Sequence, residues 1–458
     1  VHGRSLAQPR APGQALVSAT AETPRTSPLA TIGWIVFVLL LVYAVLIGGG
    51  WAGIYLGTLR TLSLALVTLG LAVWLVLSLR DPRWRPGTAI WPALVLPVVA
   101  LTLTTFTSWL PRRGLEYVAW AVLLVALYLL LVRVLATETA RVRIGALAAM
   151  LSLVIGLLYM GQVLVAWIEW WGLIGGLAVP PLRPLYASLS LGGPGTVQTV
   201  QVVITAIAIA GLGLAGRRRQ LLAGVLIAIT AIVVVLSASR TGWGALAVAL
   251  VLTGALWIAL AAREGSLRDR LAERWAQRGV RIAIAAAVIA GGAAALVAAP
   301  VVLDRLLNSG TGGRGQYFTV ALRMCEDAPI LGHGPGTWAV RRVTYTEPGE
   351  LDHYIPHAHD IYLQTLAEMG IVGAVLGLAA LVPVAWLVWR GLNAAAADTR
   401  RWAWAAVFVL LFIGLFNVFD FQMNVPAVVV LAALPVAWLD ASSRVGLGIG
   451  RAGEATAR

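Results

Sequence analysis

Residues 356–389 read PHAHDIYLQTLAEMGIVGAVLGLAALVPVAWLVW and pass directly from a histidine-rich polar segment into a long apolar run. The apolar part, 371–389, has the composition of a membrane-spanning helix, which needs about 20 mostly apolar residues. The polar part ends an insert at about 301–370, which holds four of the five histidines and the only cysteine. Ionisable groups near a bilayer are costly and usually mark a functional site. This stretch therefore predicts both a membrane protein and the region of its site.

The composition of the whole chain agrees with a membrane protein. Of 458 residues, 60% are hydrophobic and 12% are charged, against about 45–50% and about 25% in an average soluble domain. The net charge of +14 does not indicate nucleic-acid binding, because the basic residues, all arginines, punctuate the hydrophobic runs. That is the pattern of topology signals. The single Cys325 excludes an internal disulfide and a cysteine-based metal site.

Apolar runs of spanning length predict an all-α integral membrane protein with about twelve transmembrane helices and an extracytoplasmic cap of helices and loops. Residues 1–29 are polar and lack the apolar core of a signal peptide, so a disordered cytoplasmic tail is expected there. The membrane domain is expected at 30–440 and a second cytoplasmic tail at 441–458. The expected spans are 30–49, 59–79, 88–107, 115–135, 144–168, 197–215, 220–238, 242–262, 281–300, 371–389, 402–420 and 425–440.

The arginines predict the orientation of these spans, because short cytoplasmic loops are enriched in basic residues. Arginine clusters follow the second, fourth, sixth, eighth, tenth and last spans, so both termini are predicted to be cytoplasmic. Arg112 and Arg113 fall on the other side, against the rule. The main outer loops are then 169–196 and 301–370, which predicts a multi-pass protein of the cytoplasmic membrane with an extracytoplasmic site.

Two arginines stand out on the predicted outer side. Arg240 lies in SASRTGW between two apolar runs, and Arg314 lies between glycines in NSGTGGRGQYF. A guanidinium is a rigid fork of donors suited to a phosphate or diphosphate. The alternatives are an arginine snorkelling to the interface for Arg240 and a solvated loop arginine for Arg314. Arg183, in VPPLRPLYA, is a further candidate for substrate binding, although bracing of its loop is the stronger interpretation.

His359 stands at the entry to a helical pattern and is the candidate general base, since imidazole titrates near neutrality. The alternatives are a capping histidine and a metal ligand, because His353, His357, His359 and Asp360 could together hold zinc. Asp360 is also suited to cap the following helix. Asp420 lies on the same outer side.

Two further features favour structural roles. Glu368 is expected to be a buried hydrogen-bond partner. The alternating glycines of DAPILGHGPGTW, residues 327–338, lack the context of a dinucleotide fingerprint and favour a rigid turn over a pocket for a lipid phosphate.

Three segments together resemble the O-antigen ligase and O-antigen polymerase superfamily, whose members move glycans from undecaprenyl diphosphate. SASRTGW resembles that family's SRTGW signature. GGRGQYFTVALRMCEDAPILGHGPGTW and HAHDIYLQTLAEMGIVGAVLGL resemble its two later blocks, in the same order and with similar spacing. Asp360 departs from the family, which commonly has asparagine there.

The resemblance implies a metal-independent, cofactor-free and inverting transferase on the outer face of the membrane. Arg240 and Arg314 would hold the donor diphosphate, and His359 would take the proton of the acceptor hydroxyl. Arg183, His357, Asp360 and Asp420 are expected to bind substrate. The expected partners are an undecaprenyl-diphosphate-linked glycan, a glycan, lipid or protein acceptor, and membrane lipids, with no nucleic acid.

Two other functions fit a polytopic chain. A transporter or flippase would need charged or broken helices near the middle of the membrane, often in two related halves. A noncatalytic assembly scaffold would not depend on the arginines and the histidine. Ligase, polymerase and protein-oligosaccharyl transferase activities are not separated by any residue in the sequence.

Overall fold

The computed structural model describes residues 28–49, 57–176, 191–263, 314–346 and 356–446, together with a few single residues between 281 and 293. Throughout these ranges the chain is helical, without a strand. In chain order the elements are α1 (Pro28–Tyr43), η1 (Ala44–Gly48), α3 (Gly57–Arg80), η2 (Pro82–Trp84), α4 (Trp91–Phe106), α5 (Pro111–Leu135), α6 (Glu138–Ile174), α7 (Pro194–Leu212), α8 (Arg217–Leu236), α9 (Arg240–Arg263), α12 (Arg314–Asp327), α13 (Trp338–Arg341), η4 (Arg342–Tyr345), α14 (Ile361–Leu392), α15 (Ala397–Phe416), η5 (Gln422–Asn424) and α16 (Pro426–Gly446). The predicted all-α fold class is therefore confirmed.

Ten helices in the described part of the chain are long and apolar enough to cross a membrane. Each coincides with one of the twelve expected spans. Of the remaining two, the span at 88–107 is the shorter helix α4, which has 16 residues. The span at 281–300 falls almost entirely outside the described residues, so the count of twelve stays a prediction.

The expected end of the span at 144–168 was wrong. Helix α6 runs on to Ile174, into the loop expected at 169–196, and ends where Gly175 adopts a left-handed conformation with φ 66°. It extends beyond the apolar run that marks the membrane, since a cap and not hydropathy fixes where a helix ends. Helix α14 begins at Ile361, where Asp360 caps its first turn, but its backbone is not helical at Gly370, so the part beyond this break begins where the span was expected, at Ile371.

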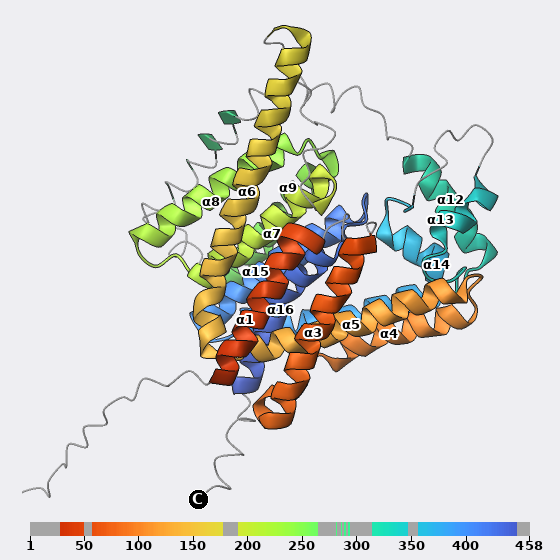
Figure 1. Cartoon of the computed structure of the whole chain (residues 1–458), viewed down its shortest axis with the longest axis horizontal. Coiled ribbons are helices and arrows are strands. Elements are labelled where there is room, and N and C mark those ends of the chain that lie inside the picture. Colours follow the sequence, from red (N-terminus) through yellow and green to blue (C-terminus); the bar gives the residue numbers. More distant parts are fainter. Residues whose placement is uncertain are drawn as a thin grey trace, which may run out of the picture.

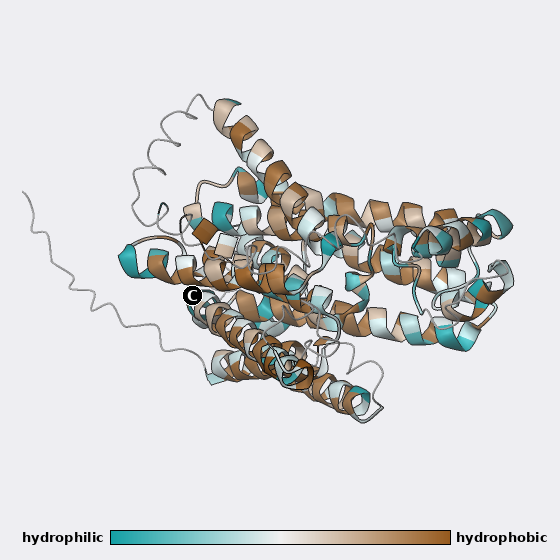
Figure 2. Ribbon diagram, turned by 90° about the horizontal axis from the view of Figure 1, so that it is seen from above, coloured by the Kyte–Doolittle hydropathy of each residue, from teal (hydrophilic) through white to brown (hydrophobic). Residues whose placement is uncertain are grey.

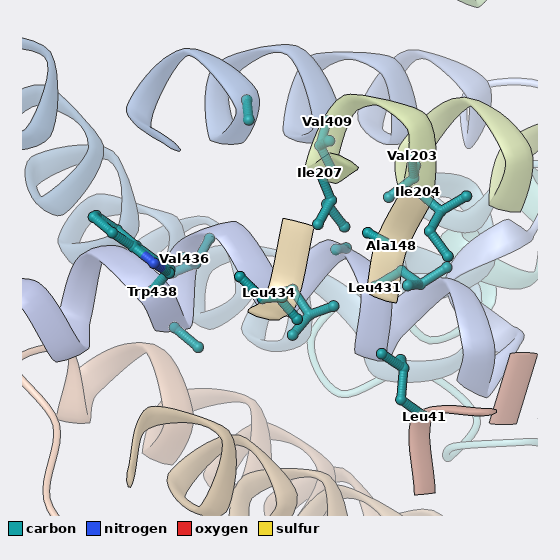
Figure 3. Packing of buried hydrophobic residues seen from close by; sticks show 14 of the residues in the cluster. Leu41, Ala148, Val203, Ile204, Ile207, Val409, Leu431, Leu434, Val436 and Trp438 are labelled. Atoms are coloured by element: carbon teal, nitrogen blue, oxygen red, sulfur yellow. The ribbon is translucent and has the colours of Figure 1, made fainter. Parts of the chain in front are cut away.

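The core of the bundle lies between α6, α7, α15 and α16, and α1 packs against it. Helix α7 is the innermost, with most of its side chains buried. Figure 3 shows how the buried aliphatic side chains of this core meet. Helices α6 and α7 approach closely because Gly145 and Gly211 face each other: a Cβ at Gly145 would lie 2.5 Å from the backbone of Gly211. Small residues permit such packing, which is the main source of helix association in lipid.

The outer surface of the bundle is apolar. On α14, the exposed side chains include Val375, Leu378, Leu381 and Val382, each more than half exposed. Figure 2 shows apolar residues over most of the helix lengths, with hydrophilic residues gathered mainly toward helix ends. A helical surface of this kind is suited to contact with lipid tails.

The insert packs against the turn between α4 and α5. The N–H of Trp109 donates to the carbonyl of His333 (3.1 Å), and the guanidinium of Arg341 lies over the Trp109 ring at 5.2 Å. Helices α12 and α13 lie together beside the ends of α4 and α5 and the start of α14 (Figure 1). Arg113, the exception to the arginine rule, lies here too: its Cγ is 3.0 Å from where a Cβ at Gly336 would lie.

Candidate functional site

The turn between α8 and α9 carries Arg240 and packs against α7. The Oγ of Ser237 lies 2.8 Å from Oε1 of Gln198, to which it donates, and a Cβ at Gly242 would clash with the same amide. Ala238 adopts φ 49°, a conformation that costs a residue with a side chain roughly 1–3 kcal/mol and tends to cluster at functional sites. Arg240 follows as the first residue of α9 and is half-buried.

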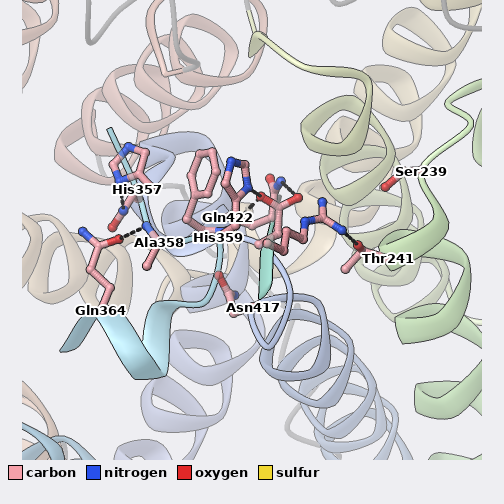
Figure 4. Close-up of polar contacts among 12 residues, drawn as sticks. Ser239, Thr241, His357, Ala358, His359, Gln364, Asn417 and Gln422 are labelled. Atoms are coloured by element: carbon pink, nitrogen blue, oxygen red, sulfur yellow. Dashed lines mark hydrogen bonds and ion pairs between the residues drawn. The ribbon is translucent and has the colours of Figure 1, made fainter. Parts of the chain in front are cut away.

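Arg314 begins α12 and lies against the start of α9. Its Nη1 donates to Oγ1 of Thr241 at 3.2 Å, and Thr241 is the residue after Arg240. Figure 4 shows this contact, with Ser239 on the same turn. The two arginines, 74 positions apart in the chain, therefore stand at neighbouring helix starts. Helix N-termini carry unpaired N–H groups and a partial positive charge, so both ends favour an anion there.

His359 stands just before α14 in a left-handed conformation with φ 55°. Its Nδ1 lies 3.8 Å from Oδ1 of Asp420, is buried, and makes no hydrogen bond. The ring stacks on Tyr317 of α12 at 5.9 Å between centroids and meets the Phe421 ring edge-on at 4.7 Å. Because Nδ1 faces Asp420, Nε2 is the nitrogen left to contact a substrate.

His357 lies two residues away but in a different environment. It is buried, stacks on Phe421 at 4.4 Å, and its Nδ1 lies 3.3 Å from Nδ2 of Asn424. Burial, with a smaller contribution from the neighbouring His359, lowers the pKa of His357 to about 4. The His357 imidazole is therefore neutral near pH 7 and is suited to hydrogen bonding.

Asp420 connects His359 to the end of α15 and the start of α7. Its Oδ1 accepts from the N–H of Phe421 (2.9 Å), and its Oδ2 accepts from Nε2 of Gln422 (3.3 Å). A Cβ at Gly195, in the first turn of α7, would lie 3.8 Å from Oδ2 of Asp420 and 3.4 Å from Oγ of Ser239. The glycine thus lets α7 approach both the carboxylate and the α8–α9 turn.

Glu368 and Asp360 shape the segment that carries the histidines. Glu368 is buried and accepts from the N–H groups of Gly336 (2.9 Å) and Trp338 (2.8 Å). The expectation of a buried hydrogen-bond partner is therefore confirmed, and the glycine run of 327–338 is a turn with φ of 64°, 106° and 71° at Gly332, Gly334 and Gly336. Oδ1 of Asp360 caps α14 by accepting from the N–H groups of Tyr362 and Leu363, while burial raises the pKa of its carboxyl group.

The structure brings Arg240, Arg314, His357, His359 and Asp420 to one region, where the ends of α7, α8, α9, α12, α14 and α15 meet. Asp360 borders this region but directs an oxygen to its own helix, as the capping interpretation expects. Arg183 and His353 lie outside the described residues. Among the residues that are described, no group of three or more His, Cys, Asp and Glu side chains has the arrangement of a metal site.

Several residues of this region were not predicted from the sequence, namely Gln198, Thr241, Tyr317, Asn417, Phe421 and Gln422. Gln198 has a signal in the sequence, because it is a polar residue inside an apolar run. The aromatic and amide residues at 417–424 have none, since similar residues end many membrane helices.

The fold and this region together define a class of protein. It is a helical, polytopic membrane protein in which arginine-bearing helix starts lie beside a histidine and a carboxylate. Residues 224–378 match a family model described as O-Antigen ligase. The matched segment includes Arg240, Arg314 and His359. This match supports the resemblance of the segment to the O-antigen ligase and polymerase superfamily. No curated protein matches the chain.

Proposed function

We propose that the protein transfers a glycan from undecaprenyl diphosphate to an acceptor hydroxyl at the outer face of the cytoplasmic membrane, with inversion at the anomeric carbon. The observation that carries the proposal is the meeting of two arginine-bearing helix starts with a histidine–carboxylate pair. Arg314 contacts Thr241 at 3.2 Å, and His359 faces Asp420 at 3.8 Å.

In this reaction the acceptor oxygen attacks the anomeric carbon while the bond from that carbon to the diphosphate oxygen breaks. The acceptor proton passes to Nε2 of His359, and the resulting imidazolium is stabilised by the Asp420 carboxylate beside Nδ1. The electron pair of the broken bond leaves with the diphosphate.

Arg240 and Arg314 would stabilise the charge that grows on the leaving diphosphate. Guanidinium groups fixed at helix starts are already oriented before the reaction, which is the condition for effective electrostatic stabilisation. Diphosphate is also a good leaving group, so this account requires no metal ion.

The test is a transfer assay with the purified protein, undecaprenyl-diphosphate-linked oligosaccharide and a set of glycan and lipid acceptors. His359→Ala is expected to lower turnover about 100- to 10,000-fold, the usual contribution of a general base. Arg314→Ala is expected to lower it about 100-fold or more, with partial recovery in Arg314→Lys. Arg390→Ala is the matched control, because Arg390 lies at the other end of α14 over the Trp386 ring.

Two further measurements bear on the mechanism. The new glycosidic bond should have the anomeric configuration opposite to that of the donor, and a chelator should leave turnover unchanged. Full turnover in His359→Ala would refute the role of the histidine, and loss of activity with chelator would refute metal independence.

A further inference from the structure

Two phenylalanines from distant parts of the chain meet beside the candidate site. Phe318 lies on α12, and Phe419 lies in the turn between α15 and η5. Their ring centroids are 6.4 Å apart and the rings are tilted by 37°. The Phe419 side chain is 49% exposed, so one ring of the pair is accessible from outside.

The neighbours of the pair are the residues that surround His359. Phe318 follows Tyr317, which stacks on His359 at 5.9 Å, and Phe419 precedes Asp420, whose Oδ1 is 3.8 Å from Nδ1 of His359. The pair therefore stands at the edge of the histidine site.

Gln422, three residues after Phe419, supplies a polar group near the pair that favours a carbohydrate over a hydrocarbon. Gln422 is 3% exposed, donates through Nε2 to Asp420, and has a buried Oε1 without a hydrogen-bond partner. An unpaired carbonyl oxygen is an acceptor suited to a hydroxyl. Figure 4 shows Gln422 beside His359. An isoprenoid chain would leave this oxygen without a partner.

The face of an aromatic ring is negative, and the C–H face of a pyranose ring is weakly positive, so the two attract each other while the sugar hydroxyls remain free for polar partners. We propose that Phe318 and Phe419 form a stacking surface for a pyranose ring of the glycan substrate, next to His359. This inference rests on the proposed glycan transfer. The sugar belongs either to the donor or to the acceptor, and both present the same chemistry to the rings.

The test measures binding, which does not depend on turnover. The probes are undecaprenyl diphosphate, the same lipid carrying one sugar, and a panel of methyl pyranosides, each titrated into the purified protein in nanodiscs. Phe419→Leu and Phe318→Leu keep apolar volume but remove the ring face, whereas Phe419→Trp keeps it. The expected result is about a 3- to 10-fold weaker Kd for a sugar-bearing probe in the leucine variants, the size of one aromatic contact, and binding near wild type in Phe419→Trp.

The outcomes distinguish a donor sugar, an acceptor sugar and the isoprenoid chain as the group that contacts the two rings. Weaker binding of the glycosylated lipid alone identifies the donor sugar, and weaker binding of a methyl pyranoside identifies the acceptor sugar. An equal loss for the sugar-free lipid would assign the rings to the isoprenoid chain and overturn the proposal. Unchanged binding of all probes would overturn it too.

Two controls accompany the titrations. Phe106→Leu, at the exposed end of α4, should leave every Kd unchanged. His359→Ala should keep sugar binding while losing transfer, which distinguishes a failure of the stacking surface from a failure of the proposed reaction.

Discussion

At the scale of single residues, His357 and His359 are separated by one alanine and yet have different chemistry. His357 is 8% exposed and stays neutral because burial lowers its pKa to about 4. His359 is 29% exposed and directs Nδ1 toward a carboxylate. The left-handed conformation at His359 turns the two rings to different surroundings, although Phe421 contacts both.

The lowered pKa of His357 predicts a dependence of stability on pH. An unfolded histidine binds a proton below about pH 6.5, but folded His357 does not until about pH 4. Between about pH 4 and 6.5 the unfolded state therefore binds more protons than the folded state. The free energy of unfolding is thus unaffected by protonation of His357 above about pH 6.5 and decreases as the pH falls toward 4. The loss is about 1.4 kcal/mol per pH unit for one such group.

Thermal unfolding in detergent between pH 7 and 4.5 measures this effect. The wild type is expected to lose more Tm on acidification than His357→Gln, which keeps hydrogen-bonding capacity and does not titrate. Parallel curves for the two proteins would show that His357 does not carry the pH dependence.

At the scale of elements, helix α14 is broken at Gly370, where φ is 60° and ψ is −163°. The loop that ends α12 fills the break: the N–H of Gly334 donates to the carbonyl of Glu368 (2.7 Å), and the N–H of Ile371 donates to the carbonyl of Pro329 (2.8 Å). A Cβ at Gly370 would lie 2.4 Å from the backbone of Ile330. The loop after α12 thus forms hydrogen bonds with the backbone groups that the break in α14 exposes. In a transporter, by contrast, the exposed backbone of a broken helix binds the substrate.

Glu368 fixes this loop to α14, so Glu368→Ala should destabilise the fold. The change leaves the buried N–H groups of Gly336 and Trp338 without their acceptor, at roughly 1–3 kcal/mol each. The expected result is a clear fall in Tm, measured by thermal unfolding in detergent. Glu326→Ala, on the exposed side of α12, is the matched control and should leave Tm nearly unchanged. Equal Tm values for the two variants would show that Glu368 does not stabilise the fold through this loop.

Gln198 positions Arg240 through the α8–α9 turn, and Gln198→Leu should therefore affect turnover more than stability. The leucine removes the link from the Ser237 hydroxyl to α7 and leaves that hydroxyl only the carbonyl of Val234 as acceptor, but it keeps an apolar side chain beside Gly242. In the transfer assay kcat is expected to fall about 10-fold, with a smaller change in KM for the donor.

Gln201→Leu is the matched control, one turn further along α7. Gln201 bonds to Ser152 and Thr230 and not to the α8–α9 turn. It should lower Tm without a comparable loss of kcat. If both glutamine variants lose kcat equally, the effect comes from general packing of α7.

At the scale of the whole molecule, two described contacts join loops for which the arginine pattern predicts the same, cytoplasmic, side. The guanidinium of Arg401 in α15 lies 3.1 Å from where a Cβ at Gly213 would be, and Arg141 at the start of α6 lies over the Trp438 ring at 5.9 Å. The insert instead packs against the α4–α5 turn, near which Arg113 lies. Which side of the membrane each group of loops faces stays a prediction.

The single cysteine allows this orientation to be tested. Cys325 on α12 is half-buried, and an impermeant maleimide should label it in intact spheroplasts if the insert is extracytoplasmic. In a Cys325→Ser background, a cysteine introduced at Arg218 should react only after the membrane is permeabilised. The reverse pattern would invert the predicted topology and place the site in the cytoplasm.

The sequence by itself determined the membrane class, ten helices that the structure describes, and the segments that hold Arg240, Arg314 and His359. Hydropathy and arginine placement are properties of local composition, and a bilayer acts on them directly. Helix ends were less predictable: α6 runs on past its apolar run to the cap at Gly175, and a short helix capped by Asp360 precedes the span that begins after Gly370.

Only the tertiary structure decided which side chains meet. The contacts of Arg314 with Thr241, of His359 with Asp420, and of Phe318 with Phe419 join segments 61 to 101 positions apart. No local pattern encodes such pairs, because they depend on how helix ends far apart in the chain converge. The lowered pKa of His357 is likewise a product of packing, since burial and neighbouring charge, not residue type, set it.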